Sequence, residues 1–220
     1  MSRSSGIVFG WEPYNGSATP SATVLADRSR MGNDGAITGA TWVRLPRGLW
    51  VLYFDGVNNK VTIPDSPSLA LGSSFTISVW INPDSDCGDN TTIVEKVLAY
   101  YLRLGILADG YFGSGGVYPY GSSGGARAFS GSPIPVSAWT HIIFLYSGTY
   151  TQIYVNGALN VTEASSGVIT ANSNDVGLGL KLSDSSGDYK GYMGLVTITR
   201  AISAGEILQL FNAERHFFGV

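Results

Sequence analysis

The sequence of 220 residues contains one cysteine, Cys87, so the chain cannot form an internal disulfide. Its opening residues, MSRSSGIVFGWEPYNG, lack the basic start and apolar core of a secretory signal. A protein that folds without oxidative help is suited to synthesis in a reducing compartment. We therefore expect a protein that is made in the cytoplasm without a signal peptide.

Charged residues are also scarce. They make up 13% of the sequence, about half of the ~25% that is typical of soluble domains. The formal net charge is −3, and the 13 lysines and arginines are scattered along the chain. Proteins that bind nucleic acids carry clustered basic side chains. A membrane-spanning helix needs ~18 consecutive apolar residues. The sequence has neither feature, so we expect no nucleic-acid partner and no membrane insertion.

The residue patterns of catalytic sites are missing too. Glycoside hydrolysis needs two facing carboxyl groups, which on one strand appear as acids two residues apart, as in E-x-D-x-E. Asp84, Asp86 and Asp89 are spaced similarly, but they lie in a polar segment with the composition of a solvated turn. Cys87 has no neighbouring histidine to activate it, and no G-x-S-x-G elbow precedes a helix. We predict no catalytic residue and no hydrolysis of polysaccharides.

What the sequence does contain is a regular β pattern, clearest between residues 49 and 83. Three β-like runs lie there, at 50–54, 61–64 and 75–81. Phe75, Ile77, Val79 and Ile81 occupy alternate positions of the third run, which indicates a strand with one buried face. Residues between the runs, such as Asp55-Gly56, have turn chemistry because glycine and asparagine tolerate positive φ.

Further strands are predicted along the whole chain. Residues 152–156 and 159–163 should form a hairpin across Asn156-Gly157, a strong turn signal. Ser203 and Glu206 form a capping box that starts the one expected helix. The length suits a single all-β domain over residues 1–220. The predicted core consists of Phe54, Phe75, Ile77, Val79, Ile81, Trp139, Ile143, Tyr154 and Val196.

An ordered series of motifs carries a family resemblance. It comprises FDG at 54–56, SPSL at 66–69, SFTISVWI at 74–81, AWTH at 138–141, IYVNG at 153–157 and RAIS at 200–203. In this order they resemble laminin G-like domains of the concanavalin A-like lectin/glucanase superfamily. The resemblance implies a two-sheet antiparallel jelly-roll sandwich with one short C-terminal helix. It implies little about function, since such folds host many functions.

The resemblance also raises the question of calcium, which many relatives bind through loop oxygens. Asp27 matches the acidic residue of the relatives' N-terminal loop, with Asn33 as a helper. Relatives carry an Asp-Glu pair where this chain has Gly194 and Leu195. Because both acids are missing, we expect no tight calcium site, and a contact of Asp27 with Arg28 or Arg30 is the alternative.

Residues 105–132 are rich in glycine and aromatic side chains, and they form either a strand pair or a long exposed loop. Tyr111, Tyr118 and Tyr120 with Arg127 offer rings on which a sugar can stack and polar groups that bind its hydroxyls. Two other interpretations stay open. In one, the rings pack into the sandwich. In the other, they form a protein interface, because tyrosine and arginine are enriched at such interfaces.

The apolar end of the chain, residues 216–220, suggests an assembly surface. Phe217 and Phe218 need cover, from a groove on the same subunit or from a neighbouring chain. These features together predict a non-catalytic binding or structural module. The resemblance extends to laminin G-like decoration, tail and fibre proteins of phage virions, which work through protein contacts. The alternative is a lectin-like module that binds a glycan through an aromatic cleft.

Overall fold

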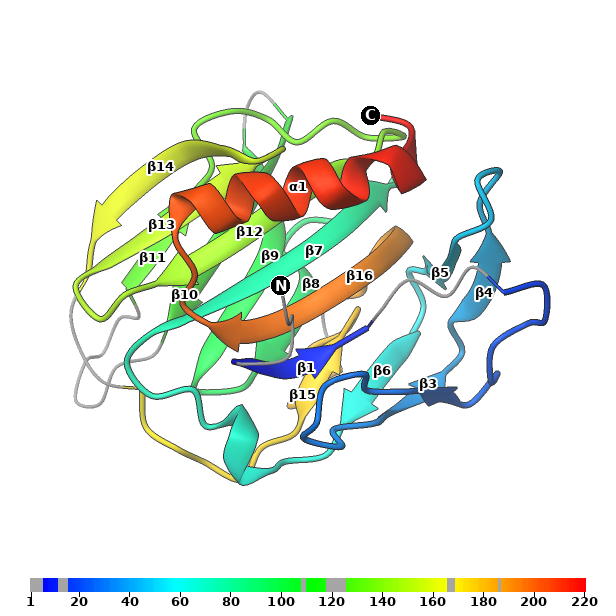
Figure 1. Cartoon of the computed structure of the whole chain (residues 1–220), viewed down its shortest axis with the longest axis horizontal. Helices are drawn as coiled ribbons and strands as arrows, with labels where there is room; N and C mark the ends of the chain where they lie inside the picture. The colour runs from blue at the N-terminus through cyan, green and yellow to red at the C-terminus, as the bar shows by residue number, and fades with distance from the viewer. Residues whose placement is uncertain (1–5, 12–15, 108–109, 118–125, 166–168, 186) are drawn as a thin grey trace.

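Strands and one long helix form three layers in the computed structural model (Figure 1). The structure describes residues 6–11, 16–107, 110–117, 126–165, 169–185 and 187–220. Its strands build two sheets in which every neighbouring pair is antiparallel. The arrangement confirms the predicted jelly-roll sandwich with one C-terminal helix.

The first sheet, here called sheet A, has the order β14-β13-β12-β7-β16-β5-β4, and β1 also pairs with β16. Its strands are β1 (Ile7–Gly10), β4 (Thr41–Arg44), β5 (Trp50–Asp55), β7 (Phe75–Pro83), β12 (Thr140–Tyr146), β13 (Tyr150–Val155), β14 (Ala158–Ala164) and β16 (Lys190–Arg200).

The second sheet, sheet B, has the order β11-β10-β9-β8-β15-β6-β3-β2. Its strands are β2 (Val24–Leu25), β3 (Gly35–Thr38), β6 (Lys60–Ile63), β8 (Thr91–Lys96), β9 (Tyr100–Leu107), β10 (Gly110–Val117), β11 (Ala126–Phe129) and β15 (Val176–Leu178). A short 3-10 helix, η1 (Pro67–Leu69), precedes β7, and the helix α1 (Ala204–Phe218) ends the chain.

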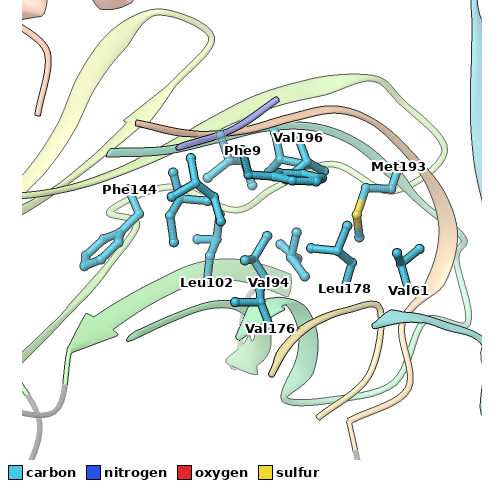
Figure 2. Packing of buried hydrophobic residues seen from close by; sticks show 14 of the residues in the cluster. Phe9, Val61, Val94, Leu102, Phe144, Val176, Leu178, Met193 and Val196 are labelled. Carbon is cyan, nitrogen blue, oxygen red and sulfur yellow. The ribbon is translucent and has the colours of Figure 1, made fainter. Parts of the chain in front are cut away.

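The main core lies between the two sheets (Figure 2). Sheet A contributes side chains such as Phe144 and Met193, and sheet B contributes side chains such as Val94 and Leu178. Six predicted core residues belong to this cluster: Phe54, Phe75, Ile77, Val79, Ile81 and Val196. The alternation of β7 therefore identified its inward face correctly.

A second apolar layer separates sheet A from α1, which crosses the outer face of the sheet (Figure 1). Trp80 packs there against Phe211 and Phe218, while Ile143 and Tyr154 pack against Ile207. The expectation of one buried face on β7 was wrong, because Thr76, Ser78 and Trp80 on the other face are also buried, Trp80 against Phe211 and Phe218 of α1. Three predicted core residues, Trp139, Ile143 and Tyr154, belong to this second layer, and Trp139 is only partly buried.

Two local predictions are confirmed by the backbone. Asn156 and Gly157 have φ values of 49° and 78°, as the turn of the β13–β14 hairpin requires. The Ser203 hydroxyl accepts a hydrogen bond from the Glu206 N–H, and the Glu206 carboxylate accepts one from the Ser203 N–H. The capping box thus sets the first turn of α1. Neither α1 nor η1, the helices of the described chain, is long and apolar enough to cross a membrane.

The C-terminal residues do not form a separate tail. The helix continues through Phe218 and ends at Gly219, which adopts a left-handed conformation with φ of 79°. Phe218 is 8% exposed and stacks on Trp80 with ring centroids 4.2 Å apart. Of the two covers expected for Phe218, the structure shows the groove on the same subunit. Phe217 is partly buried against the same cluster.

Candidate binding site

Several carboxylates of the described residues are engaged in structural contacts. Asp84 accepts a hydrogen bond from the Tyr53 hydroxyl at 3.0 Å, and Asp86 forms an ion pair with Lys190 at 2.5 Å. Glu95 is buried in sheet B and binds the Arg103 guanidinium at 2.6 Å. No three histidine, cysteine, aspartate or glutamate side chains of the described chain are grouped as metal ligands would be.

A buried polar cluster beneath α1 has the composition of a catalytic triad but a different geometry. The Ser78 hydroxyl lies 2.7 Å from His141 Nε2, and Glu214 Oε2 lies 4.0 Å from the same nitrogen. In a triad the acid binds the opposite ring nitrogen, and the serine faces substrate. Here His141 Nδ1 has no hydrogen-bond partner among the described residues, and both Ser78 and His141 are buried. The cluster therefore contributes to the packing of α1 on sheet A.

Burial of His141 should make the protein sensitive to acid. Desolvation lowers the pKa of His141 from 6.5 to about 3. The unfolded chain takes up this proton below pH 6.5 while the folded chain does not, so stability falls as pH falls. Each pH unit contributes about 1.4 kcal/mol, so His141 should reduce the free energy of unfolding by about 3 kcal/mol between pH 7 and pH 4.

Urea denaturation at several pH values measures this loss. The His141→Gln variant should be less stable at pH 7 but should lose about 3 kcal/mol less than the wild type on acidification. The other histidine, His216, is exposed on α1, so His216→Gln is the matched control for the removal of a histidine. Equal pH dependence in the wild type and His141→Gln would contradict the prediction.

Asp27 is the centre of a hydrogen-bond network. Its carboxylate accepts bonds from the N–H groups of Gly10, Ser29 and Asn33 at 2.8 to 3.0 Å and from the Ser29 hydroxyl. The Asn33 amide in turn binds the Val8 carbonyl and the Ser68 hydroxyl. These bonds join β1 to η1, and they occupy the carboxylate that the resemblance suggested as a calcium ligand.

Replacement of Asp27 by alanine should therefore destabilise the protein independently of calcium. Four donors would lose a charged acceptor, which should cost about 3 kcal/mol. Thermal unfolding of Asp27→Ala should show a lower melting temperature than the wild type, by the same amount in chelator and in millimolar calcium. A calcium-dependent rise of about ten degrees in the wild type that is absent in Asp27→Ala would show that the carboxylate does bind the metal.

The described part of the aromatic, glycine-rich segment forms strands. Tyr111 lies in β10 opposite Ile106, and Arg127 lies in β11 opposite Gly116. Tyr118 and Tyr120 lie outside the described residues. By register, Arg127 shares a cross-strand row with Tyr101 and Glu95. The structure thus places Arg127 on the same part of sheet B as the buried ion pair of Glu95 with Arg103.

A surface hollow of about 470 Å³ lies beside η1 and the start of β7. Its volume falls within the ~300–1,000 Å³ of typical small-molecule sites. The register of the sheet pairs Arg200, the last residue of β16, with Phe75 at the start of β7. This pairing brings Arg200 next to the turn that precedes β7. The wall of the hollow includes Val8, Ser68, Leu71, Ser73, Ser74 and Arg200.

The two sides of the hollow differ in chemistry. Val8 and Leu71 supply apolar surface, and Ser73, Ser74 and Arg200 supply hydrogen-bond donors. No described residue forms a hydrogen bond with either serine hydroxyl, and none forms an ion pair with the Arg200 guanidinium. Ser68 is held by Asn33 and by Ser66, whose hydroxyl lies 2.8 Å from that of Ser68. The Asp27 network therefore supports one wall, while Ser73, Ser74 and Arg200 keep polar groups that no other described residue engages.

Sequence analysis did not identify this site or the contribution of Glu214 to α1 docking. Arg200 and Ser74 were noted only as parts of family motifs, and Ser73 was not singled out. Serines and a lone arginine that are distant in the sequence have no periodicity or spacing to join them. Only the pairing of β16 with β7 reveals that they line one hollow.

Two packed antiparallel sheets with an open hollow at their rim define a lectin-like jelly-roll sandwich. The chain belongs to the Concanavalin A-like lectin/glucanases superfamily, whose laminin G-like family model matches residues 55–208. This match confirms the resemblance carried by the motifs. Among curated proteins, none matches the sequence.

Solved structures share the fold at low sequence identity. Domain 4 of AbnA, a GH43 extracellular arabinanase from Geobacillus stearothermophilus in complex with arabinotriose, has a TM-score of 0.71 and 18% identity, covering 93% of this chain and 98% of that one. The binding domain of Paraclostridial Mosquitocidal Protein 1 has a TM-score of 0.75 and 17% identity, covering 97% of this chain and 55% of that one.

A third similar structure is the binding domain of botulinum neurotoxin DC in complex with SialylT. It has a TM-score of 0.66 and 15% identity, and the match covers 95% of this chain and 52% of that one. This chain thus spans about half the length of the two toxin binding domains. At these identities the likeness establishes the fold alone.

Proposed function

We propose that this chain is a non-catalytic binding module and that its ligand is a carbohydrate held in the hollow beside η1. The observation that carries the proposal is the combination of apolar surface at Val8 and Leu71 with open donors at Ser73, Ser74 and Arg200. A sugar ring has the same two characters, because its C–H faces are apolar and its hydroxyls need hydrogen-bond partners. In a site of this kind, the apolar surface contacts the ligand and a few polar groups fix its orientation.

The similar structures support this class of ligand. The arabinanase domain was solved with arabinotriose and the botulinum domain with SialylT. The carboxylates of the described residues support the absence of catalysis, since Asp84, Asp86 and Glu95 are engaged with Tyr53, Lys190 and Arg103. We accordingly expect binding without release of reducing sugar.

The alternative is a structural subunit that works through protein contacts, with a virion as its location. Phe218 was expected to contribute an assembly surface, but Trp80 and Trp139 of the same chain cover it. We therefore rank carbohydrate binding first. The location in a virion and the synthesis in the cytoplasm stay predictions.

A glycan array tests the proposed function when a variant with a blocked hollow is probed in parallel. Ser73→Trp places a large ring in the wall of the hollow. Ser85→Trp makes the same change at an exposed position beyond the other end of β7. We expect the wild type and Ser85→Trp to bind the same glycans and Ser73→Trp to lose them. A folded wild type that binds no glycan would refute the function, and equal binding by all three proteins would refute the site.

A further inference from the structure

We propose that the hollow is selective for acidic saccharides and that Arg200 binds their carboxylate. This inference rests on the proposed carbohydrate function and adds the chemical class of the ligand. A neutral sugar in the hollow would leave the positive charge of Arg200 without a counter-charge. Three features of the structure support it: the state of Arg200, the absence of competing acids and the arrangement of the neighbouring donors.

The first feature is the Arg200 side chain itself. Arg200 ends β16, and its backbone N–H is anchored by a hydrogen bond to the Gly6 carbonyl at 3.0 Å. Arg200 lines the hollow, and its guanidinium makes no ion pair with a described residue. By contrast, Arg103, Lys96 and Lys190 are each paired with a carboxylate. Arg200 is thus a cation that lines the hollow and that no described carboxylate pairs.

The second feature is that no acidic side chain lines the hollow within the described chain. Asp27, which supports the wall through Asn33, uses both carboxylate oxygens within its own network. Asp65 follows the Ile63-Pro64 segment near η1 and is bound by Lys96 at 2.5 Å. An anionic ligand would therefore meet one open positive charge and no facing negative charge.

The third feature is the set of donors beside Arg200. A guanidinium presents a planar fork of N–H groups that matches the two oxygens of a carboxylate. Ser73 and Ser74 line the same hollow, and their hydroxyls can bind the hydroxyls of the ring. Leu71 and Val8 offer apolar contact for its C–H face. An acidic sugar can contact all three parts of the wall: its carboxylate binds Arg200, its hydroxyls bind the serines and its C–H face packs on the apolar residues. A neutral sugar leaves Arg200 without a counter-charge.

Matched saccharides test the inference directly. Trigalacturonate and its methyl ester share one sugar backbone but differ in charge, since each ester replaces a carboxylate with a neutral group that carries one methyl. The pair 3′-sialyllactose and lactose differs by one acidic sugar. Titrations followed by NMR of labelled protein would report both affinity and location. We expect the acidic member of each pair to bind at least about 10-fold more tightly, with shifts at Ser73, Ser74 and Arg200, and to weaken as salt increases.

Variants separate charge from geometry. Arg200→Gln should reduce affinity for the acidic saccharides about 10-fold or more and leave the neutral ones unchanged. Arg200→Lys keeps the charge but loses the fork, so it should recover only part of the affinity. Arg44 ends β4 as Arg200 ends β16 and does not line the hollow, so Arg44→Gln is the matched control and should bind as the wild type does. Thermal melts would verify that each variant is folded.

The outcomes distinguish this inference from the proposed function. Equal binding of acidic and neutral saccharides at the hollow, unaffected by Arg200→Gln, would overturn the inference and leave the carbohydrate function intact. Binding of sulfated saccharides alone would overturn the choice of a carboxylate. Failure of these probes and of the glycan array together would overturn both proposals. Selective acidic binding that is lost in Arg200→Gln and kept in Arg44→Gln would support both.

Discussion

Replacement of Val79 by aspartate is expected to lower the free energy of unfolding by about 4 kcal/mol or more. Val79 is fully buried in the core between the sheets, in the middle of β7, and is paired with Ile142 of β12. A carboxylate there would be ionised without a partner or would have to take up a proton. Because a domain of this kind is stable by only about 5–15 kcal/mol, this loss is a large share of its stability and should lower its melting temperature markedly.

Chemical denaturation measures the effect if the variant can be purified, and the loss of the folded circular dichroism spectrum measures it otherwise. Thr41 is exposed on β4, the last strand of sheet A in the described chain, so Thr41→Asp should change stability by no more than about 0.5 kcal/mol. An unchanged melting temperature for Val79→Asp would mean that the inward face of β7 has been assigned to the wrong side.

The second large effect is expected on the other face of the same strand. Trp80 stacks on His141, Phe211 and Phe218 with centroids 4.8, 5.7 and 4.2 Å apart. Its Nε1 donates a hydrogen bond to Glu214 Oε2 at 2.8 Å. Trp80→Ala should cost about 3–5 kcal/mol, because it leaves a cavity between sheet A and α1 and removes a donor from a buried carboxylate.

Trp80→Phe separates the two contributions, since it keeps a ring in the stack and removes only the indole N–H. It should cost about 1–3 kcal/mol. Hydrogen exchange should show faster opening of α1 in Trp80→Ala than in Trp80→Phe, while strands of sheet B such as β8 and β9 keep their protection. Equal exchange of α1 in both variants and the wild type would show that the helix is held elsewhere.

Local sequence determined the elements of this fold. The alternation from Phe75 to Ile81 identified β7 and its inward face, because successive side chains of a strand point to opposite sides. Asn156-Gly157 identified the β13–β14 turn because both positions need positive φ. Ser203 and Glu206 identified the start of α1, since the capping box is completed within one helical turn. Each of these signals depends on residues only a few positions apart.

Tertiary structure decided which surfaces those elements share. Alternation places Trp80 on the outer face of β7 but does not show that this face is buried. Trp80 is buried because α1 packs over it. Phe218 is covered by its own chain for the same reason. Asp27 has the charge of a calcium ligand, yet backbone N–H groups from β1 and the neighbouring loop take up its oxygens.

The hollow is the clearest case of a feature that tertiary structure alone could reveal. Val8, Ser73 and Arg200 come from the beginning, middle and end of the chain, and no periodic pattern connects them. They meet because β16 pairs with both β1 and β7, so that the end of β16 lies beside the turn that starts β7. Strand pairing is set by which apolar faces can be buried together across the whole sheet, and the sequence around any one of these residues does not contain that information.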